Sequence, residues 1–248
     1  MGKVMLVTGA SRGIGAEIAL LAGRSGYKVG VNYLRSEAAA QAVVARIREG
    51  GGAAVALQAD VGQQREVAAM FKRLDETLGT VAVLVNNAGV LAMFRVDAAD
   101  EANLLDVFRA NVFSAFYCSR EAIWRMSTAH GGTGGVIVNM SSVAARLGGL
   151  GGGSAYAASK AAIDTFNLAL AKEVGAEGVR VNAIRPGLIS TDIHDVQGGV
   201  AKMEQMAKTA VPLGRAGSPA EVAEVALWLA SDAASYVHGS IVDVAGGR

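Results

Sequence analysis

Tyr156 and Lys160 stand four residues apart in the segment Tyr-Ala-Ala-Ser-Lys, within a stretch from 154 to 174 that has a helical pattern. This spacing places both side chains on one face of a helix, one turn apart. A free phenol titrates near 10, and lowering that pKa to about 7 requires roughly 4 kcal/mol of preferential stabilisation of the phenolate. One ammonium at about 4 Å supplies energy of that order at an effective dielectric constant of about 20. The pair can therefore serve as a general acid and base, although the same spacing also arises by chance on solvated helices.

Short apolar runs and amphipathic stretches alternate along the chain that must position this pair. We predict strands at 4–7, 28–31, 53–57, 81–85, 136–139, 180–183 and 241–244. We predict helices at 14–25, 36–49, 63–78, 100–127, 154–174 and 219–231. This alternation predicts an α/β Rossmann fold, a doubly wound parallel sheet of about seven strands with helices on both faces. Ligands of such folds bind beyond the carboxyl ends of the strands.

No repeat, charge block or proline-rich linker divides the chain, so we predict a single domain over 1–248. The segment from 188 to 215, with Gly198 and Gly199 in its middle, is expected to form an excursion that acts as a substrate lid.

The composition excludes several classes of partner. With 23 basic and 22 acidic residues the formal charge is +1, which gives no reason to expect nucleic acid or an anionic membrane surface. No apolar run approaches the roughly 18 residues of a membrane span. Cys118 is the single cysteine, so no internal disulfide forms, and we expect a cytoplasmic protein without a metal site.

A glycine-rich turn follows the first predicted strand and reads Thr8-Gly9-Ala10-Ser11-Arg12-Gly13-Ile14-Gly15. Glycines there permit a tight turn and a close approach of the backbone to a pyrophosphate at the N-terminus of the next helix. The position between the first strand and the first helix supports this interpretation.

The same turn also matches the Gly-x-Ser-x-Gly elbow of serine hydrolases, with Ser11 as the nucleophile. A general base would then come from His130, His194 or His238, and His238 is the best placed of the three. An elbow on the first strand has no preceding strand and loop to form an oxyanion hole, and this reading leaves Tyr156 and Lys160 unexplained. We therefore favour the dinucleotide.

Taken together, separated motifs from end to end resemble the short-chain dehydrogenase/reductase family, in its short single-domain branch. They are the turn from Thr8 to Gly15, Asp60-Val61, Asn86-Asn87-Ala88-Gly89, Asn111, Ser141-Ser142, Tyr156 with Lys160, Pro186-Gly187, and the run from Val242 to Gly247. The resemblance implies an oxidoreductase that interconverts a carbonyl and a secondary alcohol by hydride transfer.

The resemblance also assigns roles. Tyr156 would be the general acid and base, and Lys160 would lower its pKa and bind the nicotinamide ribose. Ser142 would bind the substrate oxygen, and Asn111 would hold a water in a proton relay. Ser141 stays open as the alternative to Ser142, because the separation from Tyr156 is 14 residues where 13 is commoner in the family.

The cofactor residues that the resemblance implies gather at the turn and at later strand ends. They are Gly9, Ser11, Arg12, Gly13, Ile14, Gly15, Asn32, Arg35, Asp60, Val61, Asn87, Ala88, Gly89, Tyr156, Lys160, Pro186, Gly187, Ile189 and Thr191. No carboxylate follows the second strand until Glu37, whereas Arg12 and Arg35 are available to bind a 2′-phosphate. We therefore predict NADP(H) in preference to NAD(H), with Arg35 at the start of a solvated helix as the alternative.

The substrate pocket is expected from 91–95, 143–154 and 188–210. Apolar Met93, Phe94, Leu147 and Leu150 would line it, with Arg146 and His194 as polar groups if they face inward. The chain resembles both sugar dehydrogenases and 3-oxoacyl-carrier-protein reductases, and for the latter Arg120 and Arg125 could form a basic docking patch. A non-catalytic NADP-binding sensor is the third alternative. Family members of this length are usually homotetramers, which we expect here through the apolar faces of 100–127 and 154–174.

Overall fold

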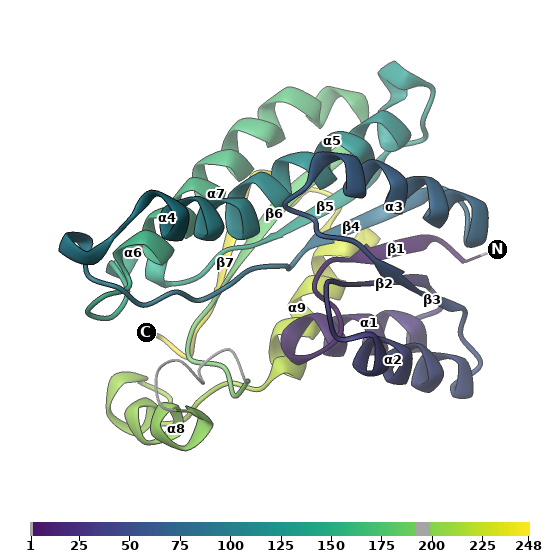
Figure 1. Cartoon of the computed structure of the whole chain (residues 1–248). Helices are drawn as coiled ribbons and strands as arrows, with labels where there is room; N and C mark the ends of the chain where they lie inside the picture. Colours follow the sequence, from purple (N-terminus) through teal and green to yellow (C-terminus); the bar gives the residue numbers. More distant parts are fainter. Residues whose placement is uncertain (1, 192–198) are drawn as a thin grey trace.

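A computed structural model describes residues 2–191 and 199–248. Its sheet has seven parallel strands in the order β3-β2-β1-β4-β5-β6-β7 (Figure 1). The strands are β1 (Val4–Val7), β2 (Lys28–Tyr33), β3 (Ala54–Gln58), β4 (Val81–Asn86), β5 (Gly135–Met140), β6 (Val179–Pro186) and β7 (Ile241–Val244). The doubly wound parallel fold is therefore confirmed.

Helices cover both faces of the sheet (Figure 1). One face carries α1 (Gly13–Arg24), α2 (Glu37–Glu49) and α9 (Pro219–Ala230). The other carries α3 (Gln64–Thr77), α5 (Ser114–Met126) and α7 (Ser154–Val174), with α4 (Glu101–Phe108) next to α7. Each face encloses its own cluster of buried aliphatic side chains. Because both faces are covered, the inner strands are apolar throughout rather than alternating.

The order of the strands reverses between β1 and β4, which are neighbours in the sheet although two strands lie between them in sequence. In sheets of this kind the crevice beyond the carboxyl ends at such a reversal receives the ligand. The turn after β1, the segment after β4, the serines after β5 and Pro186 at the end of β6 all lie at this edge.

The helix predicted over 100–127 is continuous but irregular. Between α4 and α5, Arg109–Phe113 forms a turn of π-helix. Such turns contain an extra residue, which shifts the helix register by a fraction of a turn and is frequent at functional sites. The shift brings Asn111 into the interior, where its side chain is buried.

Two further helices lie where the sequence predicted a loop and an irregular or helical excursion. The short helix α6 (Ala144–Leu147) follows the serines, and α8 (Gly199–Ala210) forms part of the predicted lid. A small separate cluster of Leu188, Met203, Ala207 and Val211 packs α8 against the chain that follows β6. Residues 192–198, including His194, lie outside the described part of the chain. None of the helices in the described part is long and apolar enough to cross a membrane.

Candidate active site

The turn between β1 and α1 is shaped to receive an anion. Gly9 and Gly13 have φ angles of +62° and +58°, values that favour glycine. A Cβ on Gly15 would lie 2.4 Å from Nδ2 of Asn87 and 2.6 Å from the carbonyl oxygen of Gly9. The first turn of α1 has no acidic residue, and Arg12 at the N-cap position provides no side-chain cap. The amides at this helix end therefore suit a pyrophosphate, so the residues fit a dinucleotide.

Three polar side chains hold the turn in place. Oδ1 of Asn32 accepts from the amide of Gly9 at 3.0 Å, and its Nδ2 donates to the carbonyl oxygens of residues 57 and 59 at 3.1 and 3.2 Å. Asn87 donates through Nδ2 to the carbonyl oxygens of Thr8 and Gly9 at 2.9 and 3.1 Å. Thr8 accepts through Oγ1 from the amides of Asn87 and Ala88, each at 3.0 Å. The side-chain amides of Asn32 and Asn87 thus hold the backbone of the turn in place. The hydrogen bonds of Thr8 serve the same purpose and were not predicted from the sequence.

Part of the predicted site comes together in one cavity that is open to solvent. Among its lining residues are predicted ones, namely Ile14, Asn87, Gly89, Ser142, Tyr156, Lys160, Pro186, Gly187, Ile189 and Thr191. The other predicted residues are not among those that line it, namely Gly9, Ser11, Arg12, Gly13, Gly15, Asn32, Arg35, Asp60, Val61, Ala88 and Asn111. Arg12 and Arg35 are exposed, and Oδ1 of Asp60 accepts from the amide of Gly62 at 2.9 Å.

The two neighbouring serines face in different directions. The hydroxyl of Ser141 is buried and donates to the carbonyl oxygen of Lys160 at 3.1 Å, which ties the end of β5 to α7. Ser142 forms a side-chain hydrogen bond with Tyr156, and its Oγ accepts from the amide of Ala144 at 3.1 Å. Ser142 is therefore the serine that contacts the phenol.

Lys160 is buried beside the phenol. Its Nζ donates to the carbonyl oxygen of Met140 at 2.9 Å and lies 5.8 Å from the centroid of the Tyr156 ring. Burial lowers the pKa of Lys160 to about 8, and the negative charge of Asp164 opposes this fall.

Burial also changes the pKa of the Tyr156 phenol. The sequence predicted a lowered pKa, whereas burial acts to raise it. It raises the pKa of Tyr156 above its ordinary value, and the hydrogen bond with Ser142 opposes that rise. The sequence predicted that Tyr156 would titrate near neutral pH. With only the protein's own groups acting on the phenol, this prediction is wrong. Loss of water around the phenolate outweighs the nearby groups, so Tyr156 is protonated near neutral pH and is in the form that donates a proton.

Asn111 braces the site from the π-turn. Its Oδ1 accepts from the amide of Val90 at 2.7 Å, and its Nδ2 donates to the carbonyl oxygen of Val90 at 3.0 Å and to Oγ of Ser159 at 2.9 Å. Ser159 in turn donates to the carbonyl oxygen of Tyr156 at 2.7 Å. Asn111 thus fixes the segment after β4 against α7, while its part in a proton relay remains a prediction.

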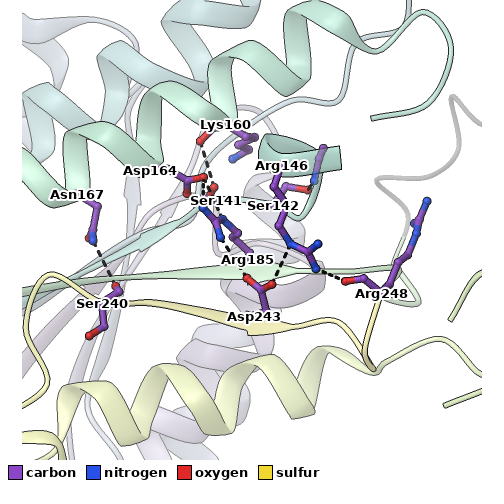
Figure 2. Close-up of polar contacts among 11 residues, drawn as sticks. Ser141, Ser142, Arg146, Lys160, Asp164, Asn167, Arg185, Ser240, Asp243 and Arg248 are labelled. Atoms are coloured by element: carbon purple, nitrogen blue, oxygen red, sulfur yellow. Dashed lines mark hydrogen bonds and ion pairs between the residues drawn. The ribbon is translucent and has the colours of Figure 1, made fainter. Parts of the chain in front are cut away.

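A chain of ion pairs runs beneath Lys160 (Figure 2). Asp164, one helical turn after Lys160 and also buried, accepts from Nε and Nη2 of Arg185 at 3.0 and 2.8 Å. Nη1 of Arg185 lies 3.5 Å from Asp243, which also accepts from Nε of Arg146 at 3.0 Å. The spacing of four between Lys160 and Asp164 on the predicted helix was the available signal for this chain, and the sequence analysis missed it.

The predicted lining of the substrate pocket is partly confirmed and partly wrong. Met93, Leu147 and Leu150 line the cavity as predicted, whereas Phe94 does not. Arg146 pairs with Asp243 and is no inward-facing handle.

The basic patch predicted on α5 is largely neutralised. Arg125 pairs with Asp75 and Glu121, and Arg120 pairs with Glu121 while stacking over Trp124.

The geometry also disfavours the serine hydrolase. Nδ1 of His238 accepts from the amide of Val181 at 3.1 Å, and its Nε2 lies 2.8 Å from the carbonyl oxygen of Ala171. Both ring nitrogens are therefore bound to backbone between α7 and β6, and neither serves Ser11 as a base. His130 is exposed at the end of a short turn of helix.

A turn that fits a dinucleotide and a Tyr–Ser–Lys cluster in one adjoining cavity define the class of dinucleotide-dependent oxidoreductases. Comparisons with known proteins agree. The family model described as enoyl-(acyl carrier protein) reductase matches residues 9–248. The chain is 46% identical over 246 residues to the uncharacterised oxidoreductase YgfF of Escherichia coli, covering 99% of each chain. It is 39% identical over 247 residues to the 3-oxoacyl-[acyl-carrier-protein] reductase FabG of Staphylococcus aureus, covering 100% of this chain and 98% of that one.

A solved structure extends the likeness to three dimensions. A short-chain dehydrogenase from Burkholderia cenocepacia in complex with NADP superposes with a TM-score of 0.90 at 33% identity, over 100% of this chain and 98% of that one. The chain therefore belongs to the short-chain dehydrogenase/reductase family and is an oxidoreductase.

Replacing Asp164 by Asn tests the electrostatic role of the ion pairs. Tyr156 lies beside Lys160 on the same helix, and Arg185 on β6 pairs with Asp164. Lys160 is protonated below its pKa of about 8, and Asp164 holds that pKa up. In Asp164→Asn the pKa falls further, so turnover that needs the ammonium declines at a lower pH than in the wild type. We expect the variant to lose about tenfold more kcat/KM, relative to the wild type, at pH 8 than at a pH about two units lower.

The measurement is the pH profile of kcat/KM at constant ionic strength. Asp75→Asn removes a carboxylate from a different partly buried ion pair, that with Arg125, and should leave the profile in place. A profile that only loses height in Asp164→Asn, with its alkaline limb unmoved, contradicts this role.

Proposed function

We propose that the protein is an NADP(H)-dependent oxidoreductase that interconverts a carbonyl compound and a secondary alcohol. The observation that carries the proposal is the meeting of Tyr156, Ser142 and Lys160 in a cavity that also reaches Ile14 at the start of α1. A group that holds a proton and a site that fits a dinucleotide thus adjoin, as hydride transfer coupled to proton transfer requires.

The residues divide the work between proton transfer and binding. When bound, the cofactor would supply a hydride for the carbonyl carbon. The protonated phenol of Tyr156 gives its proton to the carbonyl oxygen, and the hydroxyl of Ser142 donates a hydrogen bond to the same oxygen. Lys160 would hold the ribose hydroxyls of the cofactor, and its charge stabilises the phenolate left after proton transfer. The turn from Gly9 to Gly15 would hold the pyrophosphate.

The raised pKa of Tyr156 favours reduction near neutral pH. A phenol that keeps its proton is ready to donate it to a carbonyl, whereas oxidation of an alcohol begins with a phenolate and therefore gains from higher pH.

The preference for NADP(H) rests on the end of β2. Tyr33 closes that strand and is buried, and no carboxylate stands between it and Glu37. Arg12 and Arg35 are both exposed and, in the described part of the chain, neither makes an ion pair. Two free guanidinium groups suit a 2′-phosphate. The Burkholderia relative was solved with NADP, which supports the same choice.

Two further properties belong to the proposal. Four exposed apolar side chains support a homotetramer assembled through the long helices: Phe113 in the π-turn, Phe116 and Trp124 on α5, and Leu168 on α7. Cys118 is the single cysteine and is buried, so it forms no internal disulfide, which supports a cytoplasmic location.

A 3-oxoacyl thioester is the second candidate substrate. The likeness to the staphylococcal reductase and the apolar lining by Leu91, Met93, Leu147 and Leu150 favour it. The ion pairs of Arg120 and Arg125 weaken the case for a carrier-protein docking patch on α5.

Arg35→Ala tests the cofactor preference. Wild-type kcat/KM should be higher with NADPH than with NADH, and the variant should lose about tenfold or more with NADPH while changing little with NADH, because only the 2′-phosphate needs the guanidinium. Initial rates with both cofactors measure this. Equal efficiency in the wild type, or an NADH preference unchanged in Arg35→Ala, contradicts the proposal.

Tyr156→Phe separates the enzyme from the non-catalytic sensor. The variant lacks the proton donor and should lose about 100-fold or more in kcat with any carbonyl substrate, while NADPH binding measured by fluorescence stays close to wild type. Tyr236→Phe alters a fully exposed tyrosine and serves as the matched control. The substrate comes from a screen of carbonyl compounds in which turnover is measured by the absorbance of NADPH. If Tyr156→Phe turns over at the wild-type rate, Tyr156 is not the proton donor.

A further inference from the structure

The substrate end of the active-site cavity has apolar walls. Two separate segments form them, the chain after β4 and the chain between β5 and α7. The large apolar side chains that these segments contribute are Val90, Leu91, Met93, Val143, Leu147 and Leu150. Within 89–93 and 143–153, both of which the structure describes in full, no residue that lines the cavity has a polar side chain. A substrate therefore meets hydrocarbon on both of these sides.

The two walls are joined through the glycine-rich loop before α7. The amide of Phe94 donates to the carbonyl oxygen of Gly152 at 2.8 Å, and the amide of Gly153 donates to the carbonyl oxygen of Leu150 at 2.8 Å. A Cβ on Gly153 would lie 3.7 Å from Sδ of Met93, so the loop and the segment after β4 are in close contact there. These backbone groups of the loop are thus bound to one another rather than open to a ligand.

The polar side chains in the remainder of the lining are largely bound to backbone. Asn87, Ser141 and Lys160 each donate to backbone carbonyl oxygens at distances of 2.9 to 3.1 Å. The hydroxyl groups of Ser142 and Tyr156 remain, and the proposed chemistry uses both of them on a single carbonyl oxygen.

Two other polar residues border the cavity. The hydroxyl of Thr191 donates to the carbonyl oxygen of Ile189 at 3.3 Å. Figure 2 shows the side chain of Arg248 leading away from Ser142 and Lys160. Neither side chain is therefore placed beside the apolar walls to bind further hydroxyl groups of a substrate.

Two of the wall residues are exposed to an extent that is informative for apolar side chains. Val90 is 44% exposed and Leu147 is 45% exposed. An apolar group that covers them gains the free energy of removing hydrocarbon from water. A hydroxyl group placed against the same side chains loses its own water without a new partner, which costs binding energy.

We propose that this site takes a carbonyl compound with an apolar body and rejects polyhydroxylated compounds such as sugars, with Leu147 as a specificity-determining residue. The inference rests on the proposed carbonyl reduction and names its substrate class. One oxygen of the substrate binds Ser142 and Tyr156, and the carbon skeleton lies between the wall after β4 and the wall that contains Leu147 and Leu150.

The first test compares ketones of equal size and equal carbonyl reactivity. Wild-type kcat/KM with NADPH is measured for 4-methylcyclohexanone and for 4-hydroxycyclohexanone, in which a hydroxyl replaces the methyl group. We expect the methyl compound to be preferred by about 10- to 100-fold, the range for a hydroxyl that is buried without a partner. Along the series from 2-butanone to 2-octanone, kcat/KM should rise about two- to fourfold per methylene until the cavity is filled.

The second test assigns the preference to the wall. Leu147→Ser should reduce the methyl-over-hydroxyl ratio about three- to tenfold by raising KM for the methyl compound, while kcat/KM for 2-butanone stays within about twofold of wild type. Leu147→Met keeps an apolar side chain of similar volume and should keep the ratio. Leu213→Ser is the matched control, because Leu213 is 68% exposed and lies outside the lining of this cavity.

Three results overturn the inference: 4-hydroxycyclohexanone used as well as its methyl analogue, a flat response along the 2-alkanones, or a ratio that Leu147→Ser leaves unchanged or alters no more than Leu213→Ser does. Failure of the proposed function is distinct, since it is the absence of turnover with every ketone. Calorimetry of the two cyclohexanones with the NADPH-loaded protein then decides. Binding of the methyl compound that is about tenfold tighter, and weaker in Leu147→Ser, supports the apolar site, whereas equal or absent binding rejects it.

Discussion

The arrangement of the active site depends on an ammonium group that is kept charged inside the protein. Lys160 is buried on the inner side of α7, where burial lowers its pKa to about 8. A buried charge is tolerated only where hydrogen bonds and an opposite charge replace the lost water. The carbonyl oxygen of Met140 supplies the first and Asp164 the second. Both must remain close to the ammonium, which constrains β5 and α7 together.

Hydrogen bonds from neighbouring serine and asparagine side chains reinforce this constraint. Ser141 ties the end of β5 to the backbone of Lys160, and Ser159 ties the preceding turn of α7 to Asn111. Asn111 then holds the main chain at Val90, so the segment after β4 is fixed to the same helix. Ser142 is the member of the group left to contact Tyr156. The phenol consequently meets the cavity beside a serine and a lysine whose positions are set by backbone contacts.

The strands, the glycine turn and the pairing of Tyr156 with Lys160 could be predicted from the sequence, because each depends on the pattern of a single chain segment. The apolar runs predicted all seven strands, and the glycines at 9, 13 and 15 predicted the turn, since only glycine avoids the clash at Gly15 and the strain at Gly9 and Gly13. The spacing of Tyr156 and Lys160 predicted a shared face of one helix.

The remainder depends on contacts between distant segments. The π-turn at Arg109–Phe113 accompanies bonds from Asn111 to Val90 and Ser159, which no local pattern reveals. The direction in which Arg146 points depends on Asp243, nearly a hundred residues later. The rise in the pKa of Tyr156 is likewise a consequence of burial, and burial is a property of the assembled fold.

Titration of Lys160 itself measures most directly whether this buried ammonium has a lowered pKa. In protein labelled with ¹³C at lysine Cε, the signal that disappears in Lys160→Met identifies this residue, and its chemical shift reports protonation as the pH is raised. We expect a midpoint of about 8, well below the ordinary value of 10.5 for a lysine side chain. A midpoint at the ordinary value would show that the ammonium is solvated, and the burial on which the site depends would be contradicted.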